Sequence, residues 1–347
     1  MSKRIILTGA NGFVGSHILS RLLAAGHSVR SIVRSQAKAS QVAADFPDYD
    51  GQHLDFGIVP DITTPGAFNE AVKSSPPFDI LIHTASPFLY GAVSNNLDFL
   101  DPAIKGTLEV LKAVKEFAPS VMRVVLTSSC AAVINFAAPF ASDPPKVYTE
   151  EDWNPITWEK ALTGPANNGY QASKKFAEQA AWDFVQKGKP NFDLVTLTPP
   201  MIYGPLRHSI ASVKQLNESN LRIYNLFVNS KEDAELPPNG LHIYTDVRDI
   251  ALAHVKAATI PEASGQRFII CAGHVSSQEI SDILRKSMPE LKSRTPKGTP
   301  GAKVDPKLFT ASSEKAKKVL GLTYKTKEET FVELAKQLLE IERNEKV

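Results

Sequence analysis

Short, continuous apolar runs alternate with segments of helical spacing through the first two-thirds of the chain. Five runs have strand length, at residues 4–9, 28–34, 78–86, 123–129 and 192–200. Runs of this kind are typical of parallel strands that are buried on both faces. The segments with helical spacing include residues 15–26, 101–117 and 173–188. This alternation predicts an α/β fold with a doubly wound parallel sheet of the Rossmann type.

The repeating pattern ends near residue 200. A polar stretch follows at 207–220, and residues 244–258 then predict a capped helix. We therefore expect a large unit and a smaller C-terminal α/β lobe. The expected dinucleotide-binding domain comprises residues 1–200 with a return segment at 241–262, and the expected substrate-binding lobe comprises residues 201–240 and 263–347.

Charge and hydropathy limit the class of partner. In 347 residues, 39 basic side chains balance 37 acidic ones, without the basic block that nucleic acid or an anionic membrane attracts. No apolar run approaches the roughly twenty residues of a membrane helix, and the first residues lead into a strand rather than a signal sequence. We expect a cytoplasmic monomer or homodimer that acts on a small molecule and binds neither nucleic acid nor membrane.

Cysteine and histidine spacing argues against a disulfide scaffold and a metal site. Cys130 and Cys271 stand in apolar surroundings without a CxxC pair, and a reducing compartment fits best. None of the eight histidines has metal-ligand spacing such as HExxH. We therefore expect no metal, and we expect His83, at the end of a strand, to be a packed neutral histidine.

A glycine-rich turn, TGANGFVG, joins the first predicted strand to the first predicted helix. Gly9, Gly12 and Gly15 allow a tight turn, a close approach to a pyrophosphate, and close packing of the helix on the sheet. The free N–H groups at the start of the helix attract phosphate. Any tight turn between strand and helix can use a glycine, but the position directly after the first strand favours dinucleotide binding.

The end of the second predicted strand bears on the choice of cofactor. An acidic residue there would bind the ribose 2′-hydroxyl of NAD. The chain instead has Arg34, with Lys38 one helical turn later, and a guanidinium suits a 2′-phosphate. The alternative is two solvated cations on a surface helix, but their placement favours NADPH/NADP+.

Tyr170 and Lys174 stand four residues apart in a predicted helix, so they share one face. A nearby cation lowers the pKa of a phenol, which lets tyrosine protonate an alkoxide. Ser128 and Ser129 end a strand at the sheet edge where ligands bind, and a hydroxyl there can bind a substrate carbonyl. The alternatives are a packed tyrosine beside a solvated lysine, and a serine that only caps its strand.

Several motifs together resemble the extended short-chain dehydrogenase/reductase family. They are TGANGFVG at 8–15, HTASP at 83–87, TSS at 127–129, YQASK at 170–174, PPMIYGP at 199–205 and DVRDIA at 246–251. The chain is similar to the dihydroflavonol and cinnamoyl-CoA reductase branch, and most similar to fungal NADPH-dependent methylglyoxal and aldehyde reductases, also used as ketoreductases. The resemblance implies that Ser129 polarises the carbonyl, Tyr170 donates the proton, and Lys174 binds the nicotinamide ribose and tunes Tyr170.

The resemblance also implies two sets of binding residues. The cofactor set, besides Tyr170 and Lys174, is Gly9, Asn11, Gly12, Phe13, Val14, Gly15, Arg34, Lys38, Asp61, Ile62, Thr84, Ala85, Ser86, Pro199 and Met201. The substrate set is Phe88, Ile134, Asn167 and Tyr203, with Met201 shared, and most of these residues can equally belong to an ordinary core. Cys130 and Ile134 stand where relatives often carry aromatic residues, which leaves the pocket size open.

We therefore predict an NADPH-dependent carbonyl reductase for an aldehyde or ketone, with hydride from C4 of the nicotinamide and a proton from Tyr170. One alternative is an NAD-dependent nucleotide-sugar epimerase or dehydratase, which uses the same serine, tyrosine and lysine but does not suit Arg34. Another is a regulator that senses NADP without chemistry, which has no use for the complete set of three. The sequence leaves the physiological carbonyl and the stereochemistry open.

Overall fold

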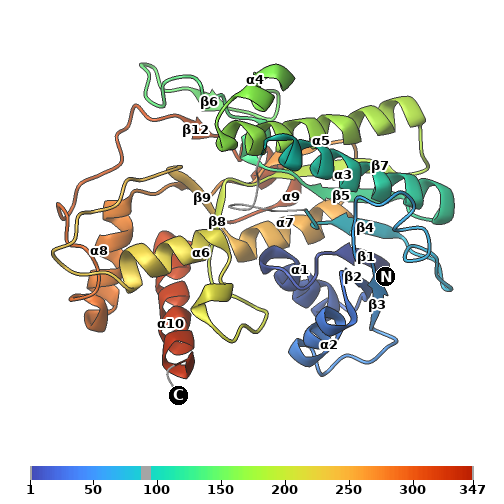
Figure 1. Cartoon of the computed structure of the whole chain (residues 1–347), viewed down its shortest axis with the longest axis horizontal. Helices are drawn as coiled ribbons and strands as arrows, with labels where there is room; N and C mark the ends of the chain where they lie inside the picture. The colour runs from blue at the N-terminus through green and yellow to red at the C-terminus, as the bar shows by residue number, and fades with distance from the viewer. Residues whose placement is uncertain (1, 87–94, 346–347) are drawn as a thin grey trace.

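The structure, a computed structural model, describes residues 2–86 and 95–345. Its centre is a seven-stranded sheet in the order β10-β7-β5-β4-β1-β2-β3, in which every pair of neighbours is parallel (Figure 1). The strands are β1 (Arg4–Thr8), β2 (Ser28–Val33), β3 (Leu54–Ile58), β4 (Ile80–His83), β5 (Arg123–Thr127), β7 (Asp193–Thr198) and β10 (Arg267–Ile269). The predicted doubly wound sheet is confirmed. The strand order reverses between β1 and β4, where open α/β sheets bind ligands.

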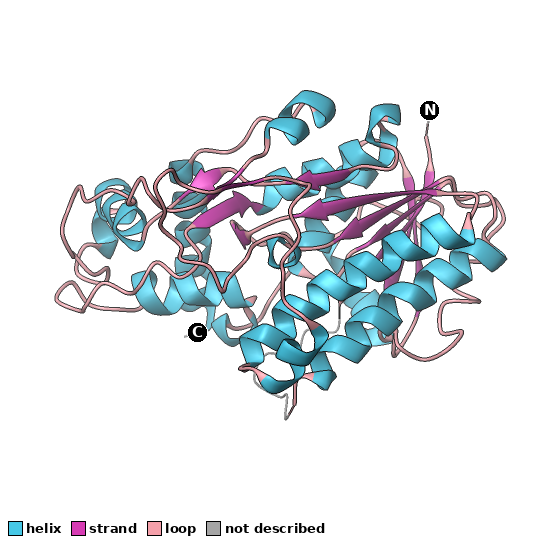
Figure 2. Ribbon diagram, turned by 90° about the horizontal axis from the view of Figure 1, so that it is seen from above, coloured by secondary structure: helices cyan, strands magenta, loops and turns pink. Residues whose placement is uncertain are grey.

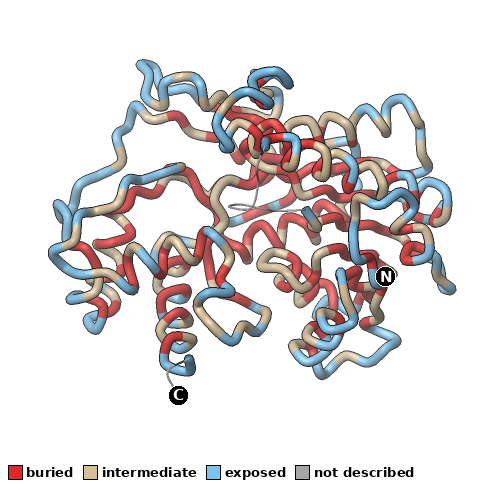
Figure 3. The backbone as a smooth tube through the Cα atoms, in the orientation of Figure 1, coloured by how far each residue is buried: buried red, intermediate tan, exposed pale blue. Residues whose placement is uncertain are grey.

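Helices cover both faces of this sheet (Figures 1 and 2). One face carries α1 (Phe13–Ala24), α2 (Gln36–Asp45), α7 (Val247–Thr259) and α9 (Glu314–Leu320), and the other carries α3 (Leu97–Phe117) and α5 (Ala166–Gly188). Burial is concentrated along the central strands and the helix faces that cover them (Figure 3). The strands read as continuous apolar runs because both of their faces are covered. In the described part of the chain, no helix is both long and apolar enough to cross a membrane.

A smaller lobe lies at one end of the sheet and has its own core, which includes Phe227 and Phe331. Its three-stranded sheet has the order β11-β9-β8, from β8 (Met201–Tyr203), β9 (Ile243–Asp246) and β11 (Gly273–His274). Its helices are α6 (Glu218–Ile223), the π-helix η3 (Tyr224–Val228), α8 (Ser277–Ser287) and α10 (Lys327–Glu345). The remaining short elements are β6 (Val147–Tyr148), β12 (Thr310–Ala311), α4 (Trp158–Thr163), η1 (Cys130–Ala132), η2 (Val213–Gln215), η4 (Pro261–Ala263) and η5 (Pro289–Leu291).

Strand β10 departs from the expected division of the chain. The sequence predicts residues 263–347 in the lobe, but β10 pairs with β7 through Arg267 and Thr196 and so belongs to the main sheet. Helix α9 likewise packs against α7 and β10. A strand of three residues gives no periodic signal, so the sequence could not indicate this return to the sheet. The rest of the division into two units stays a prediction.

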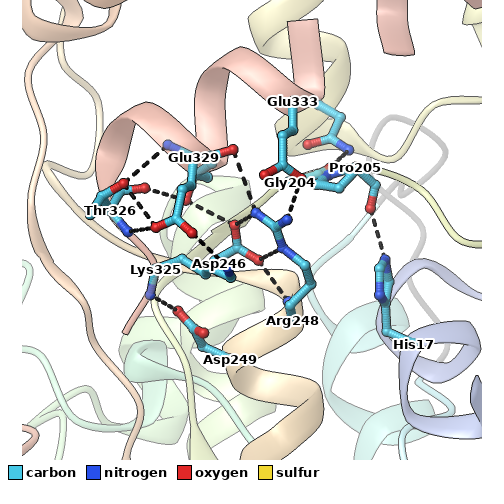
Figure 4. A network of polar contacts seen from close by, with 12 residues as sticks. His17, Gly204, Pro205, Asp246, Arg248, Asp249, Lys325, Thr326, Glu329 and Glu333 are labelled. Carbon is cyan, nitrogen blue, oxygen red and sulfur yellow. Dashed lines mark hydrogen bonds and ion pairs between the residues drawn. The ribbon is translucent and has the colours of Figure 1, made fainter. Parts of the chain in front are cut away.

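A polar network joins the lobe to the sheet through α7 and α10 (Figure 4). The fully buried Asp246 caps α7, pairs with Arg248 at 2.8 Å, and accepts a hydrogen bond from the Thr330 hydroxyl of α10 at 2.8 Å. Arg248 also pairs with Glu333 of α10. Because each charge in this network has a partner, it holds the two helices in one arrangement.

Candidate active site

The turn between β1 and α1 is too tight for side chains. Gly9 has φ of +73°, and a Cβ atom there would lie 2.8 Å from Thr84 Oγ1. A Cβ atom on Gly15 would lie 2.1 Å from the Gly9 carbonyl oxygen. The Gly12 N–H donates to that same carbonyl at 3.0 Å. Three backbone segments therefore meet here only because these residues are glycine, which leaves the helix N-terminus open for an anion.

A cavity of about 510 Å³ opens at this turn, beside the point where the strand order reverses. Thr8, Ile32, Val33, Val59 and Pro60 also line it, and the sequence did not single these out. Many of the predicted cofactor residues line the cavity together, namely Gly9, Asn11, Gly12, Arg34, Asp61, Ile62, Thr84, Ala85 and Ser86. The volume and position suit part of a nucleotide.

Arg34 projects from the end of β2 at the edge of this cavity and is exposed. Within residues 2–86 and 95–345, no carboxylate pairs with it, whereas Arg30 on the same strand is bound to Asp55 at 2.5 Å. Asp61 is engaged locally, because the backbone N–H and the hydroxyl of Thr63 donate to it and hold its pKa below the ordinary value. A cation without a carboxylate partner at this edge suits a 2′-phosphate.

A second cavity, of about 700 Å³, adjoins the first and shares Asn11 and Gly12 with it. Phe13 and Lys38 line it, so the structure brings two further predicted residues to the same place. Lys38 donates to Gln41 at 2.9 Å. The lobe contributes residues that the sequence analysis missed, including His208, Ser209, Gln215 and Asn217. Their only signal in the sequence is the polar character of residues 207–220.

Tyr170 and Lys174 lie one turn apart on α5, as predicted. The Nζ atom of Lys174 is 5.9 Å from the centre of the Tyr170 ring, and it donates to Ser86 Oγ at 3.0 Å. Burial lowers the pKa of Lys174 to about 8. Because Ser86 lines the 510 Å³ cavity, its bond to Lys174 joins the predicted catalytic helix to the predicted cofactor site.

The two serines after β5 have different surroundings. Ser128 is buried and donates to Glu178 Oε2 at 2.6 Å, so its proton is committed. Ser129 accepts a hydrogen bond from the Ala131 N–H at 3.1 Å, which leaves its own O–H able to donate. The following turn, η1, packs against α5. Of the two, Ser129 therefore has the hydroxyl that can bind a carbonyl oxygen.

The structure does not bring every predicted substrate residue to a cavity. Ile134 is fully buried beside Cys130 in a core cluster, and Tyr203 is 3% exposed in the lobe core against Phe331. The resemblance aligns positions along the chain but not the direction of their side chains, so a substrate contact for either residue stays a prediction. Asn167 is exposed in the first turn of α5. Phe88 lies outside the described residues.

The remaining predicted cofactor residues lie near the site with other contacts. Val14 packs against the core under α1, and the Pro199 carbonyl accepts a hydrogen bond from the Cys130 N–H at 2.9 Å. Met201 is partly buried and pairs with Tyr244 of β9. None of these contacts brings a side chain to either cavity.

His83 and the two cysteines behave as ordinary buried groups. His83 Nδ1 lies 2.9 Å from the Thr8 hydroxyl, and burial lowers its pKa to about 4, so the ring is neutral as predicted. Cys130 and Cys271 are free thiols in one core cluster, and burial raises both pKa values. Among residues 2–86 and 95–345, no group of three His, Cys, Asp or Glu side chains could hold a metal ion.

Comparison with known proteins places this geometry in a family. The NAD dependent epimerase/dehydratase family matches residues 5–271. The ketoreductase azaE of Aspergillus niger is 39% identical over 94% of this chain and 94% of its own length. The NADPH-dependent methylglyoxal reductase GRE2 of Saccharomyces cerevisiae is 36% identical, over 97% of this chain and 98% of its own.

A solved structure agrees with these relatives over the whole fold. The yeast methylglyoxal/isovaleraldehyde reductase Gre2 complexed with NADPH superposes with a TM-score of 0.91 at 34% identity, and covers 98% of this chain and 99% of its own. The family match spans more than half of the chain, and the relatives extend it to nearly the full length. The chain therefore belongs to the NAD dependent epimerase/dehydratase family, the extended short-chain dehydrogenase/reductases that its motifs indicate.

Proposed function

We propose that this chain is an NADPH-dependent carbonyl reductase that converts small aldehydes or ketones to alcohols. The observation that carries the proposal is that Lys174 lies near the Tyr170 ring and bonds to Ser86 in the wall of a cavity, while the turn that follows Ser129 packs on the same helix. The similarity to a ketoreductase and to methylglyoxal reductases supports the reaction class.

The residues present fit the cofactor. The glycine turn leaves space that a Cβ atom would fill, and Arg34 stands at the cavity edge without a carboxylate partner in the described chain. We propose that the turn binds the pyrophosphate, and that Arg34 and Lys38 bind the 2′-phosphate. When bound, NADPH supplies a hydride from C4 of its nicotinamide.

The protein's own groups then manage the proton and the developing charge. Ser129 donates a hydrogen bond to the carbonyl oxygen, which stabilises negative charge as it forms. Tyr170 donates its phenolic proton to that oxygen. Protonated Lys174 lies near the Tyr170 ring and lowers the cost of the phenolate that remains. We also propose that exposed Asn167, one turn before Tyr170, contacts the substrate.

The two alternatives have less support. An epimerase or dehydratase that retains NAD would favour an acidic residue at the end of β2, and the chain has Arg34 there. A regulator without chemistry does not require a serine with a free donor beside the tyrosine helix. We further propose that the protein is cytoplasmic and is a monomer or a homodimer. Light scattering during gel filtration would measure the oligomeric state.

The decisive experiment follows NADPH absorbance with methylglyoxal, isovaleraldehyde and an aromatic ketone, with NADH in parallel. We expect turnover with NADPH well above that with NADH. Tyr170→Phe should bind NADPH as wild type does but lose most turnover, by about 100-fold or more. Tyr49→Phe, a partly buried tyrosine after α2, is the control and should retain activity. Turnover at the wild-type rate in Tyr170→Phe would reject Tyr170 as the proton donor.

A further inference from the structure

A buried carboxylate lies on the catalytic helix beyond the predicted catalytic pair. Glu178 follows Lys174 by one turn and Tyr170 by two, so all three share one face of α5. It is 1% exposed. Its oxygens accept hydrogen bonds from Ser128 Oγ at 2.6 Å, Thr196 Oγ1 at 2.8 Å and Arg267 Nε at 2.7 Å. A carboxylate buried this deeply is stable only when it is paired and hydrogen-bonded in this way.

Arg267 fixes the orientation of this carboxylate. It lies on β10, is 7% exposed, and binds both Glu178 oxygens, at 2.7 and 3.1 Å. Its guanidinium also stacks 3.8 Å from the Trp153 ring centre and donates to the carbonyls of Glu150 and Asp152. Because the guanidinium is held on all sides, the Glu178 carboxylate has little freedom to rotate.

The proposed reductase reaction does not use Glu178, but its contact with Ser128 affects the neighbouring Ser129. The backbone N–H groups on either side of Ser129 bind β7 and the residue that follows it, from Ser128 to the Leu197 carbonyl at 2.8 Å and from Cys130 to the Pro199 carbonyl at 2.9 Å. These bonds fix the serine segment to the sheet. The Ser128 side chain adds a bond to α5, the helix that carries Tyr170 and Lys174.

We propose that Glu178, held by Arg267, is a positioning residue that acts through Ser128 to place the Ser129 hydroxyl relative to Tyr170. This proposal rests on the proposed reductase function. It gives the two adjacent serines separate tasks, because Ser128 binds the catalytic helix and Ser129 faces the carbonyl. A small displacement of a reacting group is enough to lower the rate by orders of magnitude.

Three substitutions separate positioning from general stability. Ser128→Ala removes the bond to Glu178 and keeps the ion pair with Arg267. Thr196→Val is the matched control, because it removes another buried hydroxyl that donates to the same carboxylate and not to the serine segment. Ser128→Thr restores a hydroxyl that can donate to Glu178, and a cavity of about 20 Å³ lies beside Ser128.

We expect Ser128→Ala to lower kcat by about tenfold or more, with NADPH affinity within about twofold of wild type. Thr196→Val should lower the melting temperature similarly but keep kcat within about twofold, and Ser128→Thr should recover most of the loss. An unchanged kcat in Ser128→Ala would overturn the proposal. So would equal losses in both variants, which would indicate general destabilisation.

A second measurement needs no turnover and separates this proposal from the proposed function. The Ala131 amide donates to Ser129 Oγ, so its hydrogen exchange reports how firmly that side chain is held. Ser128→Ala should speed this exchange more than Thr196→Val does. If the wild type reduces no carbonyl, the proposed function fails while exchange still tests the positioning. If the wild type is active and Tyr170→Phe is not, the proposed function stands. In that case, unchanged Ala131 exchange and unchanged kcat in Ser128→Ala would reject only the positioning role of Glu178.

Discussion

The Nζ atom of Lys174 lies 3.0 Å from Ser86 Oγ, so helix α5 is tied to the loop that follows β4. These residues are 88 positions apart in the chain. The ammonium therefore stands between the Tyr170 ring and the wall of the 510 Å³ cavity. Its charge is available to both a phenolate and a bound ribose, and this makes the charge state of Lys174 the first property to test.

Activity should fall as the pH rises past the Lys174 pKa. Burial lowers that pKa to about 8, so the free enzyme loses the ammonium above this pH. Loss of the cation raises the cost of the Tyr170 phenolate, and kcat/KM should decline with a midpoint near 8. Lys174→Arg keeps a charge at all working pH values, so the midpoint of the decline should move to higher pH. The maximum rate of this variant will be lower. A wild-type profile that is flat through this range would contradict the assignment.

Cofactor preference should depend on Arg34. Arg34→Asp replaces the cation at the end of β2 with the acid that suits a ribose 2′-hydroxyl. We expect KM for NADPH to rise by about 10- to 100-fold, since charge-assisted hydrogen bonds contribute roughly 1.5–3 kcal/mol, and KM for NADH to fall. Lys318→Ala removes an exposed cation from α9 and serves as the control. An unchanged NADPH preference in Arg34→Asp would move the 2′-phosphate site elsewhere.

The glycine turn should tolerate no side chain at Gly15. In Gly15→Ala the new methyl group would lie 2.1 Å from the Gly9 carbonyl oxygen, so the turn or α1 must shift. We expect a loss of stability of about 2 kcal/mol or more and weak NADPH binding by fluorescence titration. Gly51→Ala is the matched control, because its methyl group meets nothing within 4 Å. Normal binding by Gly15→Ala would show that the pyrophosphate does not use this turn.

Asp249 should make the folded state less stable as the pH rises. Burial, partly offset by the Lys325 backbone N–H, raises its pKa from 3.8 to about 6. The unfolded chain therefore releases this proton at a lower pH than the folded chain, so the contribution of Asp249 to stability is lost between these two values.

Asp249→Asn removes this pH dependence, and its amide oxygen can still accept from Lys325. Relative to wild type, the variant should gain about 1–3 kcal/mol in the free energy of unfolding on going from acid to neutral pH. Denaturant titrations at both pH values measure the difference. If the free energies of unfolding of wild type and Asp249→Asn differ by the same amount at both pH values, Asp249 does not titrate in this range.

The sheet could be predicted because burial on both faces leaves continuous apolar runs, as in β1 and β5. Strands β3 and β10 could not, since Asp and Gly interrupt the apolar run in LDFGI and RFI has only three residues. The glycine turn and the Tyr170–Lys174 pair are local in sequence, so they could be found from their spacing, and their position beside predicted strands and the other motifs then favoured a functional interpretation. The residues alone left open which of Ser128 and Ser129 binds the carbonyl, and only the family resemblance implied Ser129. The Ser128 hydroxyl donates to Glu178, which is 50 residues away in the chain and so gives no local signal.

The residues that the lobe contributes to the 700 Å³ cavity could not be predicted either, because they are distant in sequence from the rest of that cavity. His208 of the lobe and Ser16 of α1 are 192 residues apart in the chain. They come near each other only because the lobe packs on the sheet domain. Ile134 and Tyr203 show a different limit, since the family resemblance gives their position in the chain but not their burial.

Cys130 directly follows Ser129, yet its thiol is 1% exposed and donates to the Thr198 carbonyl at 3.2 Å. Cys271 is buried in the same cluster. Aldehydes and dicarbonyls modify accessible thiolates, and this chain offers them none beside its proposed site. An enzyme of the proposed kind would therefore lose no activity through modification of a thiol by its electrophilic substrate.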